Sequence, residues 1–336
     1  MTKRWLSTAW AWVTGYQLQR PDALILETTG RCNRRCPICG ASEELTDRAR
    51  GHMTWELFTG LANEATRLGP AAVFLHAGGE PLLHPRIADM VKELGQRGLP
   101  THLCTNGTLL TTEIAGRLAR AGLDTLVVSH PAVSRENYGA CRGRLPTEGE
   151  DARLAEAMAT FGQHGGRMIL RATVLHRFVP AGSEGMIEFL RRWVAVPGLD
   201  GIEFTGYQPW PNHFREDLLK RLHRVARRCD LSLNRVCVLW DGTITPCSYD
   251  VNGRLAIGRW PQITLREAYN CAQIRRIRRG NVRGFERAEL CRRCLVPRSS
   301  SPLLIARVDK WKRTPENRKN MWVRATGRRA WNALRD

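Results

Sequence analysis

Short apolar runs typical of β-strands alternate with longer helical patterns between residues 22 and 207. A helix between two strands can bring the chain back to the starting edge of the sheet, so that the next strand runs parallel to the first. The alternation therefore predicts strand–helix–strand units and an α/β fold. Six such units fit a partial or complete α/β barrel, or an open doubly wound sheet. In each, the chemistry belongs at the carboxyl ends of the strands. The predicted strands are 22–28, 71–77, 100–105, 124–130, 167–175 and 201–207, and the predicted helices are 54–68, 86–98, 111–122, 150–164 and 184–196.

The composition is that of a globular protein. Among the 336 residues, 43% are hydrophobic, and no run of about 18 apolar residues is present to span a bilayer. The N-terminus has no signal-peptide pattern, so we expect a cytoplasmic protein whose eleven cysteines stay reduced and can bind metal. The net charge of +20 is compatible with nucleic-acid binding, but the basic residues are mostly Arg and spread along the chain, so nucleic acid is the less favoured partner.

The strand–helix alternation fades after residue 207, where a loop-rich region containing six of the cysteines begins. We therefore place a domain boundary at residue 208. The predicted parts are an N-terminal amphipathic segment (1–20), an α/β core (21–207), a cysteine-containing domain (208–304) and a basic, Trp-containing C-terminal tail (305–336).

Tryptophan and basic residues occur together near both ends of the chain. This combination is typical of segments that lie on an anionic membrane surface, so peripheral membrane binding is one hypothesis. The alternative is that these side chains pack onto the core. The residues concerned are Trp5, Trp10, Trp12, Trp311, Trp322 and Trp331.

Three cysteines directly follow the first predicted strand, at the reactive edge of the fold. Cys32, Cys36 and Cys39 have C-x3-C-x2-C spacing, which places three thiolates within reach of one small inorganic cluster. The spacing alone leaves open a zinc site that is completed by a distant ligand.

Two further motifs follow the next strands, "GGEP" after the second and "CTNGTLL" after the third. Together with the cysteines they resemble the radical S-adenosylmethionine (SAM) superfamily over about residues 22 to 207. The resemblance implies a partial (β/α)6 TIM-like barrel and a 4Fe-4S cluster with three cysteine ligands, whose fourth iron binds SAM. Glu80 would accept a charge-assisted hydrogen bond from the methionine amino group. The implied cofactor-binding residues here are Gly78, Gly79, Glu80, Pro81 and Asn106.

Ser129 and Arg142 resemble the Ser and Arg that relatives direct at the carboxylate of SAM, although a solvated Arg142 is the alternative. The chain reads "SHPA" where relatives often have Ser-x-Asp-Gly, so contacts made by that Asp are in doubt. Cys141 is a weak candidate for a thiol that returns a hydrogen atom to a substrate radical. We assign no general base among the nearby groups His76, His130, Tyr138, Tyr207 and His213.

Four later cysteines supply a complete set of thiolates. Cys237, Cys247, Cys291 and Cys294 resemble the SPASM or twitch extension of the superfamily, which implies one auxiliary 4Fe-4S cluster held by protein alone. A structural zinc with the same ligands is the alternative. We expect Cys229, like the other remaining cysteines, to be a small buried hydrophobic residue.

The resemblance implies that the protein cleaves SAM reductively to a 5′-deoxyadenosyl radical, which takes a hydrogen atom from the substrate. Only 31 residues precede Cys32, which we consider too few for a peptide-recognition module. We therefore expect a small-molecule substrate, such as a sugar, aminocyclitol or lipid-linked intermediate. The expected reaction is dehydrogenation, with flavodoxin or ferredoxin as electron donor. The alternatives are an epimerase, a peptide-maturation (RiPP) enzyme and, in another class, a non-catalytic metal-binding nucleic-acid module.

Overall fold

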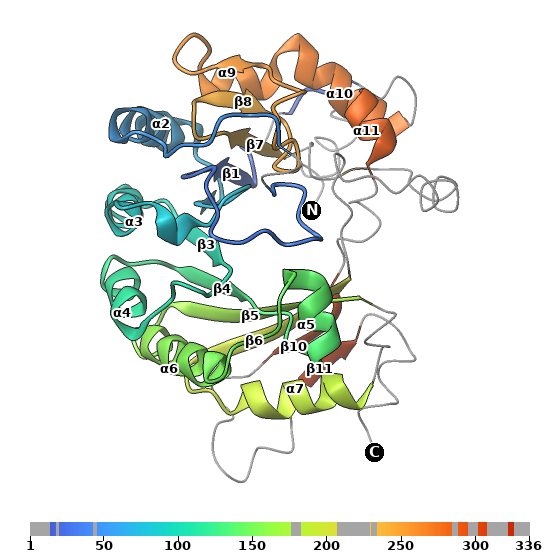
Figure 1. The fold of residues 1–336 in the computed structure, drawn as a ribbon. Helices are drawn as coiled ribbons and strands as arrows, with labels where there is room; N and C mark the ends of the chain where they lie inside the picture. The colour runs from blue at the N-terminus through green and yellow to red at the C-terminus, as the bar shows by residue number, and fades with distance from the viewer. Residues whose placement is uncertain are drawn as a thin grey trace. The chain divides into compact units, whose positions relative to one another are not determined.

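The protein is described by a computed structural model, which divides into two compact units (Figure 1). Each unit is described by itself. Unit 1 contains Met1–Asn33, Cys39–His102 and Pro209–Arg298, and unit 2 contains Arg34–Ile38, Leu103–Gln208 and Ser299–Asp336. The residues that the structure describes are 14–17, 20–42, 46–175, 183–206, 229, 234–283, 288–294, 302–307 and 322–325.

Unit 1 is built on a parallel sheet that is extended by an antiparallel hairpin. The strand β1 (Ala23–Leu26) pairs in parallel with β2 (Val73–Phe74) on one side and with β7 (Arg235–Val238) on the other. The strand β2 also pairs in parallel with the first two residues of β3 (Thr101–Thr105). Beyond β7, the strands β8 (Thr243–Thr245) and β9 (Gly258–Arg259) continue the sheet with antiparallel pairing.

The helices of unit 1 begin and end where local chemistry allows. Helix α2 (Trp55–Leu68) starts after Thr54, whose side chain accepts from the Leu57 amide, and it stops at Gly69, which has a left-handed φ of 64°. The later helices are α3 (Ile87–Gln96), α9 (Leu265–Asn270), α10 (Ala272–Arg283) and α11 (Glu289–Arg293), and a short 3-10 helix, η1, spans Pro81–Leu83.

Unit 2 is also built on parallel strands. The strands β4 (Thr125–Ser129), β5 (Arg167–Val174) and β6 (Leu199–Gly206) run in parallel. An antiparallel pair, β10 (Pro302–Arg307) and β11 (Trp322–Ala325), is added next to β6. The helices are α4 (Thr112–Arg120), α5 (Arg135–Arg142), α6 (Glu150–Gly162) and α7 (Glu184–Val194). Helices α6 and α7 pack against the parallel strands.

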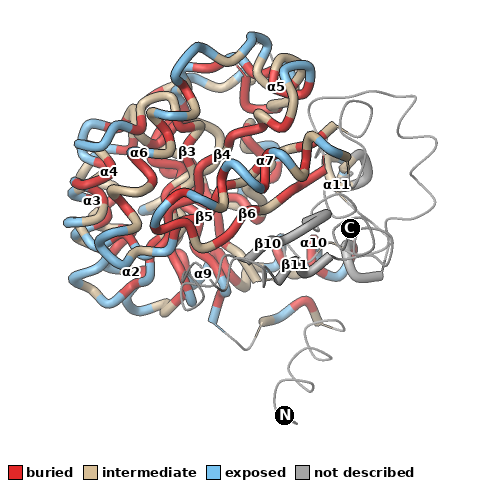
Figure 2. The backbone as a smooth tube through the Cα atoms, turned by 90° about the horizontal axis from the view of Figure 1, so that it is seen from below, coloured by how far each residue is buried: buried red, intermediate tan, exposed pale blue. Residues whose placement is uncertain are grey.

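Alternation along β5 separates a helix-covered face from a polar face. Met168, Leu170 and Ala172 are fully buried on the face that α6 contacts, whereas Arg171 and Thr173 on the other face are only half-buried. Buried residues are concentrated on the strands, as Figure 2 shows for β5 and β6. The polar face also carries Ser129, which is paired with Arg171 in register.

The predicted α/β fold with a largely parallel sheet is confirmed. All six predicted strands and all five predicted helices are present, with ends that differ by a few residues. Helix α5 was not predicted, because its apolar positions are few. The prediction of a loop-rich region after residue 207 was wrong where β7 to β9 and α9 to α11 form, since these elements are too short for periodicity to detect.

The predicted terminal segments lie mostly outside the described residues. Of the tryptophans assigned to them, the structure describes Trp322 alone, in β11. The strand β10 begins at Pro302, so it crosses the predicted start of the tail at residue 305. In the part of the chain that the structure describes, no helix has the length and apolar character needed to cross a membrane.

Candidate functional site

In unit 1, the GGEP motif packs against the loop that leads to Cys32. A Cβ atom added at Gly79 would lie 2.2 Å from the Thr29 carbonyl oxygen and 2.5 Å from that of Arg31. The Glu80 amide donates a 2.8 Å hydrogen bond to the same Arg31 oxygen. Glycine at position 79 therefore allows two backbone segments to touch, which holds the approach to Cys32.

Glu80 has a clear local role in addition to its predicted one. Its side chain is 2% exposed, and Oε1 accepts a 3.1 Å hydrogen bond from the Leu82 amide. Pro81 opens the 3-10 helix η1 that this bond caps. The contact between Glu80 and the ammonium group of SAM stays a prediction.

In unit 2, three of the predicted site residues lie together. Arg142 donates from Nη1 to the Cys36 sulfur at 3.6 Å. Its Nη2 donates to the Ser129 carbonyl oxygen and, at 3.4 Å, to the Ser129 hydroxyl. These contacts argue against a solvated Arg142, because its guanidinium is held between the end of β4 and Cys36.

The charge of Arg142 is secured by the same neighbours. Burial would lower its pKa, but the negative charge of a Cys36 thiolate and the hydrogen bond to it raise the pKa above its usual value. Arg142 therefore stays a cation, and its predicted contact with the carboxylate of SAM stays a prediction.

The structure places Cys141 inside unit 2. Its side chain is 1% exposed, and its Sγ lies 3.7 Å from the carbonyl oxygen of Thr173. Burial is the main reason that the pKa of this thiol rises to about 12. The thiol is thus kept protonated, and its predicted part in hydrogen transfer stays a prediction.

Asn106 shapes the turn after β3. Its Oδ1 accepts from the Thr108 amide at 2.9 Å and from the Thr108 hydroxyl at 2.5 Å. This is a side-chain turn of the kind that Asn commonly forms. The predicted cofactor contact of Asn106 is not tested by these bonds.

In unit 1, three thiols lie near enough to Cys247 to affect its pKa. The pKa of Cys247 lies well above its ordinary value, first because of burial and then because of repulsion from Cys229, Cys294 and Cys291. These three thiols are therefore within electrostatic range of Cys247. In the described part of the chain, no three His, Cys, Asp or Glu side chains are close enough to hold a metal ion as they stand.

Cys237, another predicted ligand, has apolar surroundings, although it pairs in register with Thr245, two residues before Cys247. It is in the middle of β7, has no exposed surface, and belongs to an apolar cluster with Ile25 and Leu239. The pKa of Cys237 is raised first by burial and then by the negative charge of Glu27. Cys229 is therefore a further candidate ligand near Cys247, and the predicted role of Cys237 stays a prediction.

A local signal could have separated these two cysteines. Cys237 stands between Val236 and Val238 in an apolar strand, where its side chain enters the core. Cluster ligands usually come from turns and loops, in which several thiolates can converge. Four thiolates at Cys229, Cys247, Cys291 and Cys294 are the soft donors that an iron-sulfur cluster takes, and they would also suit zinc.

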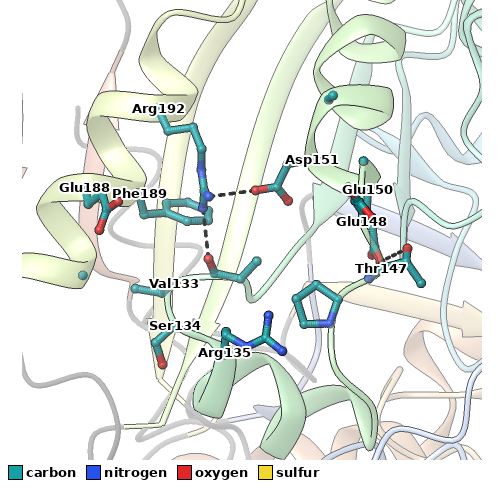
Figure 3. Close-up of a pocket in the computed structure, with 15 residues that line it drawn as sticks. Val133, Ser134, Arg135, Thr147, Glu148, Glu150, Asp151, Glu188, Phe189 and Arg192 are labelled. Atoms are coloured by element: carbon teal, nitrogen blue, oxygen red, sulfur yellow. Dashed lines mark hydrogen bonds and ion pairs between the residues drawn. The ribbon is translucent and has the colours of Figure 1, made fainter.

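A pocket of about 640 Å³ in unit 2 is lined by the starts of α5 and α6 and by α7. Figure 3 shows Arg192 pointing at Asp151, to which it is ion-paired at 2.9 Å. Asp151 also pairs with His130 at 2.7 Å. The Tyr138 hydroxyl, in turn, donates to Glu150 at 2.5 Å. His130 and Tyr138 are therefore held by structural bonds.

Two parts of the chain match known families. Residues 26–190 match the Radical SAM superfamily, and residues 229–295 match SPASM, an iron-sulfur cluster-binding domain. The chain therefore belongs to the radical SAM superfamily and carries a C-terminal SPASM domain. The second match begins at Cys229 and ends one residue after Cys294, so it encloses the cysteines grouped around Cys247.

Several curated relatives are similar in sequence. The PqqA peptide cyclase of Streptomyces rochei is 37% identical over 216 residues, which are 61% of this chain and 54% of the relative. The PqqA peptide cyclase of Gluconobacter oxydans is 30% identical over 202 residues, or 59% of this chain and 53% of the relative. The tungsten-containing aldehyde ferredoxin oxidoreductase cofactor-modifying protein of Pyrococcus furiosus is 26% identical over 256 residues, which are 67% of this chain and 70% of the relative. The chain thus spans about half the length of these two cyclases.

Solved structures share the fold. Streptococcus suis SuiB bound to its precursor peptide SuiA has a TM-score of 0.62 at 15% identity, covering 87% of this chain and 73% of SuiB. BtrN in complex with AdoMet and 2-DOIA has a TM-score of 0.57 at 17% identity, covering 82% of this chain and 94% of BtrN. At these identities the likeness concerns the fold alone, and it confirms the predicted radical SAM barrel with a C-terminal domain.

Proposed function

We propose that this radical SAM enzyme modifies a peptide. The observation that carries the proposal is the joint match of the barrel and the SPASM domain, together with relatives named as PqqA peptide cyclases. The likeness to SuiB, solved with a precursor peptide, is in line with it. This replaces the small-molecule substrate that we expected from the short segment before Cys32.

Two sets of cysteines would hold the cofactors. Cys32, Cys36 and Cys39 would hold the SAM-binding cluster, and the auxiliary cluster would take Cys229, Cys247, Cys291 and Cys294. When bound, the first cluster and SAM supply the electron and the radical that remove a hydrogen atom from an unactivated carbon. The cysteine-only donor sets support iron-sulfur clusters in both places.

The chain's own residues would orient SAM. Arg142 keeps its positive charge next to Cys36, so it would receive the carboxylate of SAM with help from the Ser129 hydroxyl. Gly79 would keep the backbone of its motif flat against the Cys32 loop. Glu80 would then present its carboxylate to the ammonium group.

Anaerobic reconstitution with iron and sulfide, followed by reduction, tests the radical chemistry. We expect about eight irons per chain and formation of 5′-deoxyadenosine from SAM, with a chemical reductant or flavodoxin as electron donor. The Cys36→Ala variant should form no 5′-deoxyadenosine. A wild-type protein that binds only zinc and forms no 5′-deoxyadenosine would contradict the proposed chemistry.

The substrate class needs a separate experiment, because BtrN, solved with 2-DOIA, favours a second candidate function, the oxidation of a small molecule. The reconstituted protein is incubated with short peptides encoded beside its gene and, in parallel, with 2-DOIA. A peptide substrate should increase 5′-deoxyadenosine formation and change mass by loss of hydrogen. If only the small molecule does so, the peptide proposal is wrong.

A further inference from the structure

Three segments of unit 1 meet around Gly78, the first glycine of the GGEP motif. A Cβ atom added there would lie 2.7 Å from Glu27 Oε1, 3.4 Å from the Ala41 Cβ and 3.5 Å from a Val251 methyl carbon. Glu27 follows β1, Ala41 is two residues past Cys39, and Val251 is four residues past Cys247. The motif thus lies against both the SAM-cluster loop and the auxiliary-cluster turn.

Arg48 joins two of these segments through one guanidinium group. Its Nη2 donates to both carboxylate oxygens of Glu27, at 2.9 and 2.7 Å. Its Nε donates to the Val251 carbonyl oxygen at 2.9 Å. The Arg48 side chain is 16% exposed and that of Glu27 is 1% exposed, so solvent screens this pair little. The planar guanidinium therefore sets the spacing between the end of β1 and the auxiliary turn.

The turn that carries Val251 is continuous with Cys247. The Asp250 amide donates to the Cys247 carbonyl oxygen at 3.1 Å. The Asp250 carboxylate accepts from the Thr245 hydroxyl at 2.7 Å and from the Leu255 amide at 2.8 Å. Ligation of Cys247 would restrain this turn, and hence the carbonyl group that Arg48 binds.

We propose that Arg48 is a positioning residue that couples the auxiliary-cluster turn to the SAM-binding motif at Gly78. The inference rests on the proposed function, since it requires that the protein binds SAM and both clusters. A shift of the Val251 carbonyl pulls on the guanidinium and so on the Glu27 carboxylate, against which Gly78 is packed without a gap. SAM binding at the first cluster consequently depends on the state of the auxiliary turn.

The test compares Arg48→Ala with a matched control, Arg254→Ala. Arg254 joins the same loop to the same turn through Asp47 at 2.9 Å, but both side chains are more than 60% exposed. SAM is titrated into the reconstituted, reduced proteins, and its binding is read from the change in the electron paramagnetic resonance spectrum of the first cluster. We expect Arg48→Ala to need a SAM concentration at least about fivefold higher than the wild type for half-maximal binding, which is a typical coupling between two sites. Arg254→Ala should need the same concentration as the wild type.

Two further variants separate coupling from a general loss of structure. Arg48→Lys keeps the charge but lacks the fork that reaches Glu27 and Val251 together, so its SAM requirement should be intermediate. Introduced into the wild type, Cys247→Ser should raise the SAM concentration needed for binding. Introduced into Arg48→Ala or Arg48→Lys, it should add little, because substitutions at coupled sites are not additive. Thermal melting identifies any variant that does not fold. If Arg48→Ala does not fold, the comparison is made with Arg48→Lys.

Normal SAM binding by the Arg48 variants, or fully additive effects with Cys247→Ser, would overturn the coupling while leaving the proposed function intact. A wild-type protein that shows no spectral change with SAM would overturn both. The iron content of each variant is measured alongside, so that loss of a cluster is not mistaken for weaker SAM binding.

Discussion

At the scale of single residues, Gly79 leaves no room for a side chain. An Ala side chain would meet two backbone carbonyl oxygens, those of Thr29 and Arg31, and backbone atoms cannot rotate away as a flexible side chain can. We expect Gly79→Ala to lower the free energy of unfolding by about 1–3 kcal/mol and to reduce iron bound at the Cys32 loop. Thermal melting and iron analysis measure the two effects.

Gly95 supplies the control for that substitution. It lies in α3, and an added Cβ would meet no atom within 4 Å. Gly95→Ala should be neutral or slightly stabilising, since Ala is the better helix former. Equal behaviour of the two variants would show that contact at the Thr29 carbonyl does not matter.

A second residue-scale prediction concerns two cysteines that differ in surroundings. Cys229→Ala should lose the auxiliary cluster, about four irons per chain, because it removes a proposed ligand near Cys247. Cys237→Ala should retain the iron and lose only about 1 kcal/mol of stability, because it removes one buried sulfur from an apolar cluster. Iron analysis of both variants checks this, and the reverse result would restore Cys237 as the ligand.

At the scale of elements, α5 and α6 together hold a part of the cysteine loop in unit 2. Arg34, two residues before Cys36, lies 3.4 Å from the Tyr138 hydroxyl of α5 and 3.6 Å from the Glu150 carboxylate of α6. Burial alone would raise the pKa of Glu150. Hydrogen bonds from Tyr138 and Thr147, together with the charge of Arg144, lower it to about 2. Glu150 is therefore ionised whenever the protein is folded near neutral pH.

The depressed pKa predicts how stability depends on pH. An acid with a lower pKa in the folded state stabilises that state above its unfolded pKa, so the contribution is lost as pH falls from about 4.5 towards 2. Near neutral pH, the contribution of Glu150 to the free energy of unfolding is on the order of 3 kcal/mol. Glu150→Gln should remove most of it and flatten the acid limb of a denaturation curve. The Glu148→Gln variant, at an exposed position two residues earlier in the chain, should keep that limb unchanged.

At the scale of the whole molecule, the auxiliary cysteines are far apart in sequence and their ligation would close long loops. Cys247 is separated from Cys291 by the helices α9 and α10. Binding energy at such a site stabilises the folded state of the region it closes. We expect iron chelation to increase hydrogen exchange in α9 and α10 while leaving α4 and α6 of unit 2 almost unchanged. An equal increase of hydrogen exchange in both units would contradict a local stabilising role of the auxiliary cluster.

Most of the fold could be predicted because it follows from local patterns. The six strands and five helices have distinct periodicity, and each begins or ends at residues such as Thr54 and Gly69 whose preferences act within one turn. Helix α5 has no such periodicity and was not predicted. The sequence therefore indicated Arg142 only through its resemblance to the Arg of related proteins, and not through the helix that brings it to Cys36.

The substrate class could not be derived in the same way. Our expectation of a small molecule used the length of chain before Cys32, and length is no measure of what a barrel binds. Relatives named as peptide cyclases point the other way. The contacts that select a substrate are long-range, and no local pattern encodes them.

By itself, the sequence determined the order of strands and helices, the superfamily and the cysteines that precede the second strand, because these depend on neighbouring residues. Only the tertiary structure decided that Cys237 is buried in an apolar cluster while Cys229 lies near Cys247, and that Arg48 links Glu27 to Val251. The physical reason is the pairing of β1 with β7, which brings residues more than 200 positions apart into one sheet and assigns each side chain to the core or to a site.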